Sequence, residues 1–266
     1  MTQGSDRAAG IRILLGLGET PRDPELFQWA ARLAAEFQAE LAALFVEDAD
    51  LIKLSGLPFA RELGGHSAAE RPLDPVRMER ALQAEARRAE RFLTQAAQSR
   101  SVRFSFHVCR GRVVRETMTY AETVDLLMFG QPRRRVAFTP DASPPRPRSK
   151  NSPIAVVYDG SAAADRALTA ALRLAEAEHA PTVVLLPAGG RNGNDTLRER
   201  ARMAAGNRRG NMRFRPLRGL GADVLVAALS IEEPRLLLLP DRQGLLAEDA
   251  LESLLSRARC PVCVTR

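Results

Sequence analysis

The sequence predicts an α/β protein built from two similar units, each a mostly parallel sheet with helices on both faces. Short apolar runs alternate along the 266 residues with longer segments whose apolar residues have helical spacing. Strand and helix joined by short connections are typical of parallel crossover units. An opening stretch at Ile11–Pro21 has a counterpart at Ile154–Ser161, each an apolar run followed at once by a helix. The repeated order predicts two doubly wound units in tandem.

The first half alternates buried strands with amphipathic helices. A helix begins at Pro21–Pro24, because proline is tolerated in a first turn. Its apolar residues then recur at the i, i+3, i+4 and i+7 spacing of a helix packed on a sheet. We expect a short helix after Asp48 and a loop around Gly64–Gly65. The expected strands are 11–17, 41–46, 102–108 and 125–129, and two further helices are expected at 76–99 and 113–123.

The second half repeats this order after a segment that breaks it. Residues 131–152 contain five prolines and six basic residues, which indicates a linker or loop. The strands expected beyond it are 154–158, 182–186, 212–217, 235–239 and 261–265, and the helices are 162–178, 195–205, 222–229 and 246–257. We therefore predict a first unit at 1–130 that lacks its last helix and strand, a linker at 131–152 and a second unit at 153–266.

Composition indicates a globular protein and sets no function. A hydrophobic content of 45% suffices for a core. No apolar run is long enough to span a bilayer and the N-terminal residues lack the pattern of a leader peptide, so we expect no membrane association. Three cysteines do not form a disulfide framework, which favours a cytoplasmic protein. The net charge of +7 comes almost entirely from arginine, a bias that GC-rich coding also produces.

Four local patterns follow one another in a recognisable order. They are Ala39–Asp48, Leu51–Leu63, Ile154–Ser161, which ends its strand in Asp-Gly-Ser, and Ala258–Val262. Together they resemble the universal stress protein family in its tandem form, which has a Rossmann-like, adenine nucleotide alpha-hydrolase-like fold. Ile154–Ser161 is similar to the family's opening strand, Ala39–Asp48 to its second strand, Leu51–Leu63 to a segment that follows it in some members, and Ala258–Val262 to its last turn. The resemblance covers residues 11–130 and 153–266. It implies a ligand crevice at the carboxyl ends of the strands.

The resemblance implies an adenine-nucleotide site only in part. Family members that bind ATP carry an aspartate after the first strand and a glycine-rich phosphate loop after the fourth, where backbone amides approach the phosphates. The second unit keeps the first part: Asp159 would contact the adenosine part or a metal, and Gly160, Ser161 and Gly244 the phosphates. The loop beyond its fourth strand, however, has one glycine and carries Asp241, Glu248 and Asp249, which would repel polyphosphate.

The first unit departs further from that pattern. Gly18 stands at the aspartate position, and Gly130-Gln-Pro-Arg133 replaces the phosphate loop. We expect no cofactor, with ATP or AMP bound by the second unit as the alternative.

Other candidate chemistry is better explained by packing. Cys260-Pro-Val-Cys263 has the spacing of a redox motif, but it leaves a helix and enters a strand, so its two thiols are expected on opposite faces. No zinc, hydrolase or dinucleotide motif is complete around the three histidines or the glycines. Arginines gather in the linker and between Arg191 and Arg218 with one aromatic residue, Phe214, among them. A solvated face explains them, and polyanion or nucleic-acid binding is the alternative.

We therefore expect a non-catalytic universal stress protein-like binding or regulatory module in a stress response. A degenerate nucleotide crevice would leave protein interactions as its mode of action. The alternatives are an ATP- or AMP-binding protein using the second unit, and a nucleic-acid or other polyanion binder. The two units should pack together, because neither covers its own sheet edge. The edge strand 262–265, which finds no obvious partner in the first unit, is expected to pair with another chain in a homodimer.

Overall fold

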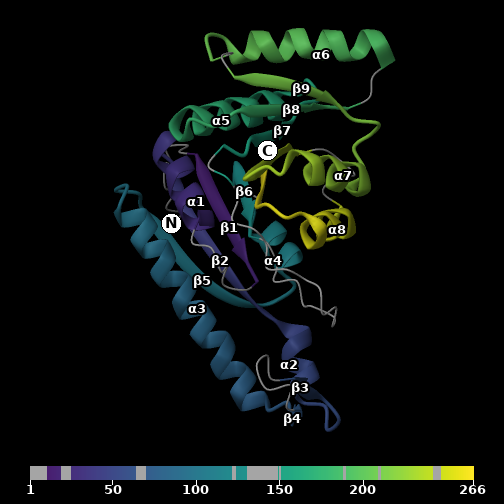
Figure 1. The fold of residues 1–266 in the computed structure, drawn as a ribbon. Coiled ribbons are helices and arrows are strands. Elements are labelled where there is room, and N and C mark those ends of the chain that lie inside the picture. The colour runs from purple at the N-terminus through teal and green to yellow at the C-terminus, as the bar shows by residue number, and fades with distance from the viewer. Residues whose placement is uncertain are drawn as a thin grey trace, which may run out of the picture.

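A nine-stranded sheet with helices on both faces forms the body of the protein (Figure 1). The computed structural model describes residues 11–18, 25–63, 70–121, 124–130, 149, 151–187, 190–208, 211–241 and 247–266. The strand order is β5-β2-β1-β6-β11-β10-β7-β8-β9. All neighbouring strands are parallel except β11 and β6. The predicted α/β class with a mostly parallel sheet is confirmed.

Among its described residues, the first half of the chain supplies four strands of this sheet and four helices. The elements are β1 (Arg12–Leu17), α1 (Glu25–Glu36), β2 (Glu40–Asp48), α2 (Ala49–Ser55), α3 (Pro75–Gln98), β5 (Phe104–Gly111), α4 (Val113–Tyr120) and β6 (Leu126–Phe129). The predicted beginning of the first helix at Pro21–Pro24 lies outside the described residues. The sequence did not predict β3 (Arg61–Leu63) and β4 (Glu70–Pro72), which pair antiparallel beside α2.

The second half supplies five strands and four helices in the predicted order. They are β7 (Ile154–Val157), α5 (Ala162–Glu178), β8 (Thr182–Leu186), α6 (Gly190–Ala205), β9 (Met212–Pro216), α7 (Ala222–Glu232), β10 (Leu236–Pro240), α8 (Glu248–Arg257) and β11 (Val262–Thr265). Helix α6 begins five residues before the predicted Asp195. The linker predicted at 131–152 lies outside the described residues except for 149, 151 and 152, so the domain division stays a prediction.

Strand β11 joins the two halves and corrects the expectation of a free edge. On one side it pairs parallel with β10, and on the other it pairs antiparallel with β6. The register sets Val264 opposite Leu127 and Cys263 opposite Met128. Because both sides of β11 are hydrogen-bonded within the chain, this strand cannot pair with a second copy. The edges of the nine-stranded sheet are instead β5 and β9.

Two apolar cores, one on each face of the sheet, run through both halves. One contains Phe27 of α1, Leu93 of α3 and Leu168 of α5. The other contains Val114 of α4, Leu225 of α7 and Leu254 of α8. The strand side chains alternate between these cores, as a sheet covered on both faces requires. The two halves therefore share their hydrophobic stabilisation, as the predicted packing of the units requires.

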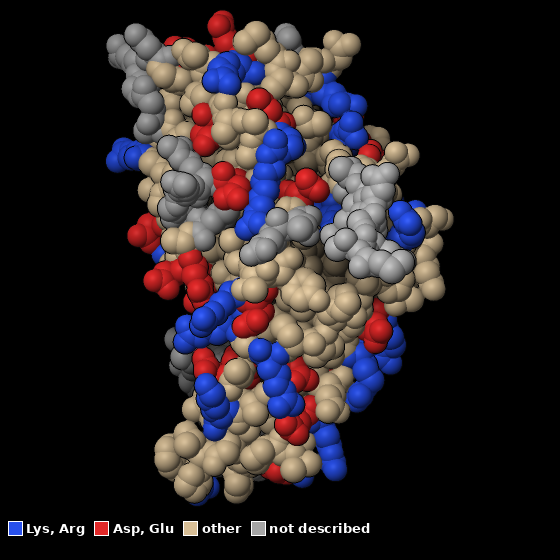
Figure 2. Space-filling model, turned by 180° about the vertical axis from the view of Figure 1, so that it is seen from behind, with Lys and Arg blue, Asp and Glu red and all other residues tan. Residues whose placement is uncertain are grey.

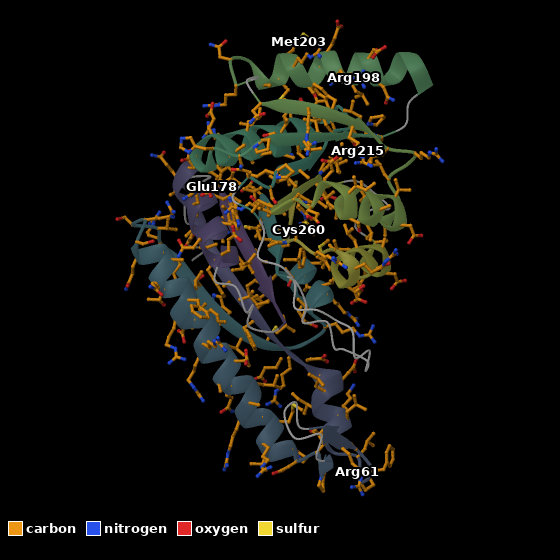
Figure 3. The ribbon with its side chains drawn as sticks, in the orientation of Figure 1. Arg61, Glu178, Arg198, Met203, Arg215 and Cys260 are labelled. Carbon is orange, nitrogen blue, oxygen red and sulfur yellow. The ribbon has the colours of Figure 1, made fainter. Side chains whose placement is uncertain are left out.

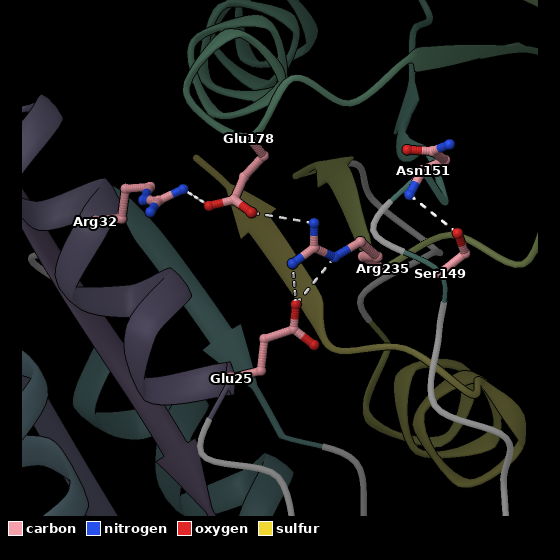
Figure 4. A network of polar contacts seen from close by, with 6 residues as sticks. All are labelled: Glu25, Arg32, Ser149, Asn151, Glu178 and Arg235. Atoms are coloured by element: carbon pink, nitrogen blue, oxygen red, sulfur yellow. Dashed lines mark hydrogen bonds and ion pairs between the residues drawn. The ribbon is translucent and has the colours of Figure 1, made fainter.

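Ion pairs close the junction between the halves at the end of α5 (Figure 4). Arg235, which precedes β10, donates to Glu25 at the start of α1 and to Glu178 at the end of α5. Glu178 also pairs with Arg32 of α1. The Arg235 guanidinium lies 4.9 Å from the centre of the Trp29 ring. Because Arg235 is only 12% exposed, these contacts are shielded from water far more than surface ion pairs are.

The segment α2–β3–β4 extends beyond the sheet at the lower end of α3 (Figure 1). The carboxylate of Asp48 caps α2 by accepting hydrogen bonds from the backbone amides of Asp50 and Leu51. The amide of Leu73 donates to the carbonyl of Ala60 and ties the segment to the start of α3. Among the described residues, no helix combines the length and the apolar character that crossing a bilayer requires.

Candidate functional site

The turn between β7 and α5 holds three of the four predicted site residues. The carboxylate of Asp159 accepts a hydrogen bond from the backbone amide of Ser161 at 3.0 Å. The hydroxyl of Ser161 caps α5 by accepting a hydrogen bond from the backbone amide of Ala164 at 3.1 Å. Gly160 has a φ of +81°, a left-handed conformation that favours glycine. The sequence Asp-Gly-Ser therefore serves a strand-to-helix turn whose polar groups make hydrogen bonds to one another.

Helix α6 covers this turn. Arg200 donates from its guanidinium to the carbonyl of Gly160 at 2.6 Å. A Cβ on Gly160 would lie 3.0 Å from the Cδ2 of Leu197 and 3.1 Å from a guanidinium nitrogen of Arg200. The backbone that would approach a phosphate is therefore in contact with side chains of the protein itself.

Tyr158 ends the apolar run in front of the turn and is fully buried. Its hydroxyl donates to Asp165 in the first turn of α5 at 2.7 Å. Burial raises the pKa of Tyr158 strongly, and the hydrogen bond to Asp165 raises it further. The tyrosine is thus a neutral, buried donor that fixes α5 on the sheet, and it is unsuited to proton transfer near neutral pH.

The phosphate side of the candidate site is acidic where it is described. Gly244, the fourth predicted site residue, lies outside the described residues. Asp241 follows β10 and pairs with Arg266 at 3.3 Å. Glu248 and Asp249 occupy the first turn of α8. Because these carboxylates already face the positive end of the helix dipole, the start of α8 does not attract a further anion.

Close packing explains the glycines at the equivalent position of the first half. A Cβ on Gly16 would lie 2.5 Å from the Oγ1 of Thr117, and one on Gly18 would lie 2.3 Å from a methyl carbon of Val113. Both neighbours belong to α4, which therefore lies directly on the end of β1. The glycines allow this close contact between helix and strand.

The cysteines of the predicted Cys-x-x-Cys spacing are separated by the sheet. Cys260 belongs to one core and Cys263 to the other, which confirms that they lie on opposite faces. Burial raises the pKa of Cys263 to about 12. None of the three cysteines forms a disulfide. Within the described ranges no cluster of histidine, cysteine and carboxylate side chains could hold a metal.

Most arginines around α6 and β9 make contacts with other side chains of the same protein. Arg208 pairs with Glu176, and Arg213 and Arg215 both pair with Glu232. Arg202 lies over the ring of Phe214. Figure 2 shows basic and acidic side chains interspersed over one face of the molecule. These contacts favour the structural interpretation of the cluster. The arginines of 131–148 and Arg209 lie outside the described residues.

The contact that most changes the site, from Arg200 to Gly160, was missed at the level of sequence. Arg200 stood among many arginines, and its position 40 residues beyond Gly160 gave no signal. His107 is exposed and packs beside Tyr120. The surface hollows found on the described residues lie on α3, near Arg91 and Gln95, and beside the end of α6, near Arg208. Neither is at the β7–α5 turn.

Comparison with known proteins gives the fold a name. No protein-family model and no curated protein matches the chain. A universal stress protein from Archaeoglobus fulgidus DSM 4304 superimposes over 96% of both chains, with 13% identity and a TM-score of 0.53. A protein from the universal stress protein family of Burkholderia pseudomallei is 28% identical over 44% of this chain and 98% of its own, with a TM-score of 0.34.

A third similar structure is less than half as long as this chain. It is the universal stress protein from Archaeoglobus fulgidus in complex with dAMP, which is 19% identical over 43% of this chain and 97% of its own, with a TM-score of 0.36. The full-length superposition shows that this chain has the fold of a universal stress protein.

Proposed function

We propose that this protein is a tandem member of the universal stress protein family that acts as a non-catalytic binding module. The observation that carries the proposal is the closure of the candidate crevice by the protein's own groups. Asp159 and Ser161 make hydrogen bonds within their turn, and Arg200 donates to the carbonyl of Gly160. A nucleotide would have to displace these contacts to reach the turn, whose residues are half-buried.

The first half supports the same function. Where the family resemblance places an aspartate, Gly18 lies against Val113 of α4. Neither half therefore offers a formed phosphate cradle among the described residues. Without a formed phosphate cradle among the described residues, the outer surface is the proposed site of action, and protein partners, a second copy included, are the proposed mode of action.

The alternative is an adenine-nucleotide protein that uses the second half, and one observation favours it. The Asp-Gly-Ser turn is intact at the carboxyl end of β7, the edge of a doubly wound sheet at which ligands bind. In this version Arg200 would swing away from Gly160, and Asp159 would contact the nucleotide or a metal. Gly160 and Ser161 would then face the phosphates.

Calorimetric titration of the full-length protein with ATP and with AMP tests the proposal. We expect no heat of binding for either nucleotide. Micromolar affinity for ATP would overturn the proposal. Asp195→Ala, which removes an exposed carboxylate on α6, is the control. If the affinity for ATP were lost in Asp159→Ala and kept in this control, the alternative function would hold. Mass spectrometry of the purified protein for a retained nucleotide gives an independent check.

A further inference from the structure

We propose that the outer face of α3 and the segment beside its start form a docking surface for an acidic polypeptide segment. The inference rests on the proposed function and deepens it, because it names the surface and the chemistry of the partner. Two features carry it: a row of exposed arginines along one face of α3, and exposed apolar residues at the beginning of that helix.

The α3 arginine row lies opposite the buried face of the helix. Leu82, Ala86 and Leu93 point into the core. At 100° per residue, the arginines fall within about a 100° arc centred on the opposite side. They are Arg77, Arg80, Arg87, Arg88 and Arg91, and all are exposed. From Arg77 to Arg91 the row extends about 21 Å along the helix axis.

Acidic side chains do not neutralise this row. Glu79 turns toward β5 and pairs with Arg110 at 3.1 Å, and Glu90 lies to one side of the arc. Arg88 lies over the ring of Phe92. Within the part of the chain that the structure describes, Arg77, Arg80, Arg87 and Arg91 have no acidic partner. This differs from the arginines of α6 and β9, most of which are paired internally.

The apolar tip adjoins the start of the row. It consists of Leu54, Leu57, Phe59 and Val76, whose exposed fractions are 46%, 38%, 75% and 54%. The hydrogen bonds from Leu57 to Leu54, from Ala60 to Leu57 and from Leu73 to Ala60 hold these residues beside the beginning of α3. Figure 3 shows Arg61 at the same end of the molecule. A cluster of large exposed apolar side chains marks an interaction surface.

The combination selects an acidic polypeptide as the occupant. Glutamates spaced along an extended or helical segment can pair with the whole α3 arginine row, while apolar residues at one end cover the tip. A nucleic acid fits the tip less well, because three of its four side chains are aliphatic and bases stack on aromatic rings. If the apolar tip inserted into a bilayer, Arg87 would lie about 16 Å from Val76 along the axis of α3. This distance exceeds the Debye length of about 8 Å, so salt would screen the attraction between Arg87 and the lipid headgroups.

The test measures binding of a labelled synthetic peptide by fluorescence anisotropy at low salt. The peptide is helical, about 21 Å long, with glutamates on one face and leucines at one end. We expect it to bind more tightly than the same peptide with lysine in place of glutamate. Arg80→Glu combined with Arg87→Glu should weaken binding about tenfold or more. Phe59→Ser should weaken it severalfold, and added salt should weaken it in the wild type.

The matched control is Arg115→Glu combined with Arg166→Glu, which reverses two exposed arginines on α4 and α5. It carries the same net charge as the α3 variant and should bind the peptide like the wild type. Equal loss in both double variants would overturn the proposal. Tighter, α3-dependent binding of single-stranded DNA or of phosphatidylserine vesicles would overturn it too. The nucleotide titration is a separate measurement, so failure of the proposed function would be seen independently of this result.

Discussion

Replacing Arg235 with alanine should destabilise the junction between the two halves measurably. The substitution removes a side chain that is 12% exposed and leaves Glu25 and Glu178, 34% and 20% exposed, without their shared cation. Breaking a fully buried pair costs about 3–5 kcal/mol, and exposed pairs contribute at most about 1 kcal/mol. Because Glu178 keeps Arg32, we expect a loss of about 2–3 kcal/mol, including the contact with Trp29.

Thermal unfolding followed by circular dichroism measures this loss. An unfolding entropy of about 2.1 cal/mol/K per residue over 266 residues amounts to about 0.56 kcal/mol/K. The expected loss therefore lowers Tm by about 4–5 °C. The control is Arg257→Ala, which breaks an ion pair whose side chains are 45% and 85% exposed and should lower Tm by less than about 2 °C. If Arg235→Ala melts no earlier than this control, the assigned role of the junction is refuted.

Four further predictions concern packing, capping and thiol chemistry. Gly16→Ala should destabilise by about 1–3 kcal/mol, because its Cβ would meet Thr117 at 2.5 Å. Gly193→Ala, which has open space around it on α6, should be neutral or stabilising; denaturation midpoints compare the two. Ser161→Ala should cost about 1 kcal/mol by removing the α5 cap, and an unchanged urea midpoint would contradict this. Because burial raises the pKa of Cys263 to about 12, its thiolate fraction at about pH 8 is on the order of 10⁻⁴, and native protein should resist iodoacetamide there. Burial, followed by Glu116 and Glu47, also raises the pKa of Cys109; Glu116→Gln should therefore lower that pKa and speed alkylation, which mass spectrometry of modified peptides measures.

The sequence alone predicted most elements, because their signals are local. The strands predicted at 154–158 and 235–239 correspond to β7 and β10, and every residue of these two observed strands is buried. The Asp-Gly-Ser stretch predicted a strand end and a helix start, and Ser161 caps α5. The sequence did not predict the short β3–β4 pair, because a strand of three residues is too short to show an alternating pattern.

The contacts that decide the candidate site are long-range, and only the tertiary structure supplied them. Arg200 reaches Gly160 from the second helix of the unit, and Thr117 reaches Gly16 across about a hundred residues. Each of these residues has an unremarkable sequence context: an arginine among arginines, and a threonine within a helix. Their significance arises from which helix lies on which strand end.

What the sequence determined by itself is therefore the repeated strand–helix order and the faces that each element buries, since spacing along one segment encodes both. The pairing of β11 with β6 was decided by the tertiary structure. The first half leaves β6 with an open side, and unpaired backbone amides and carbonyls cost too much to remain buried. The second half satisfies that edge with its last strand, and the two apolar cores are continuous across both halves.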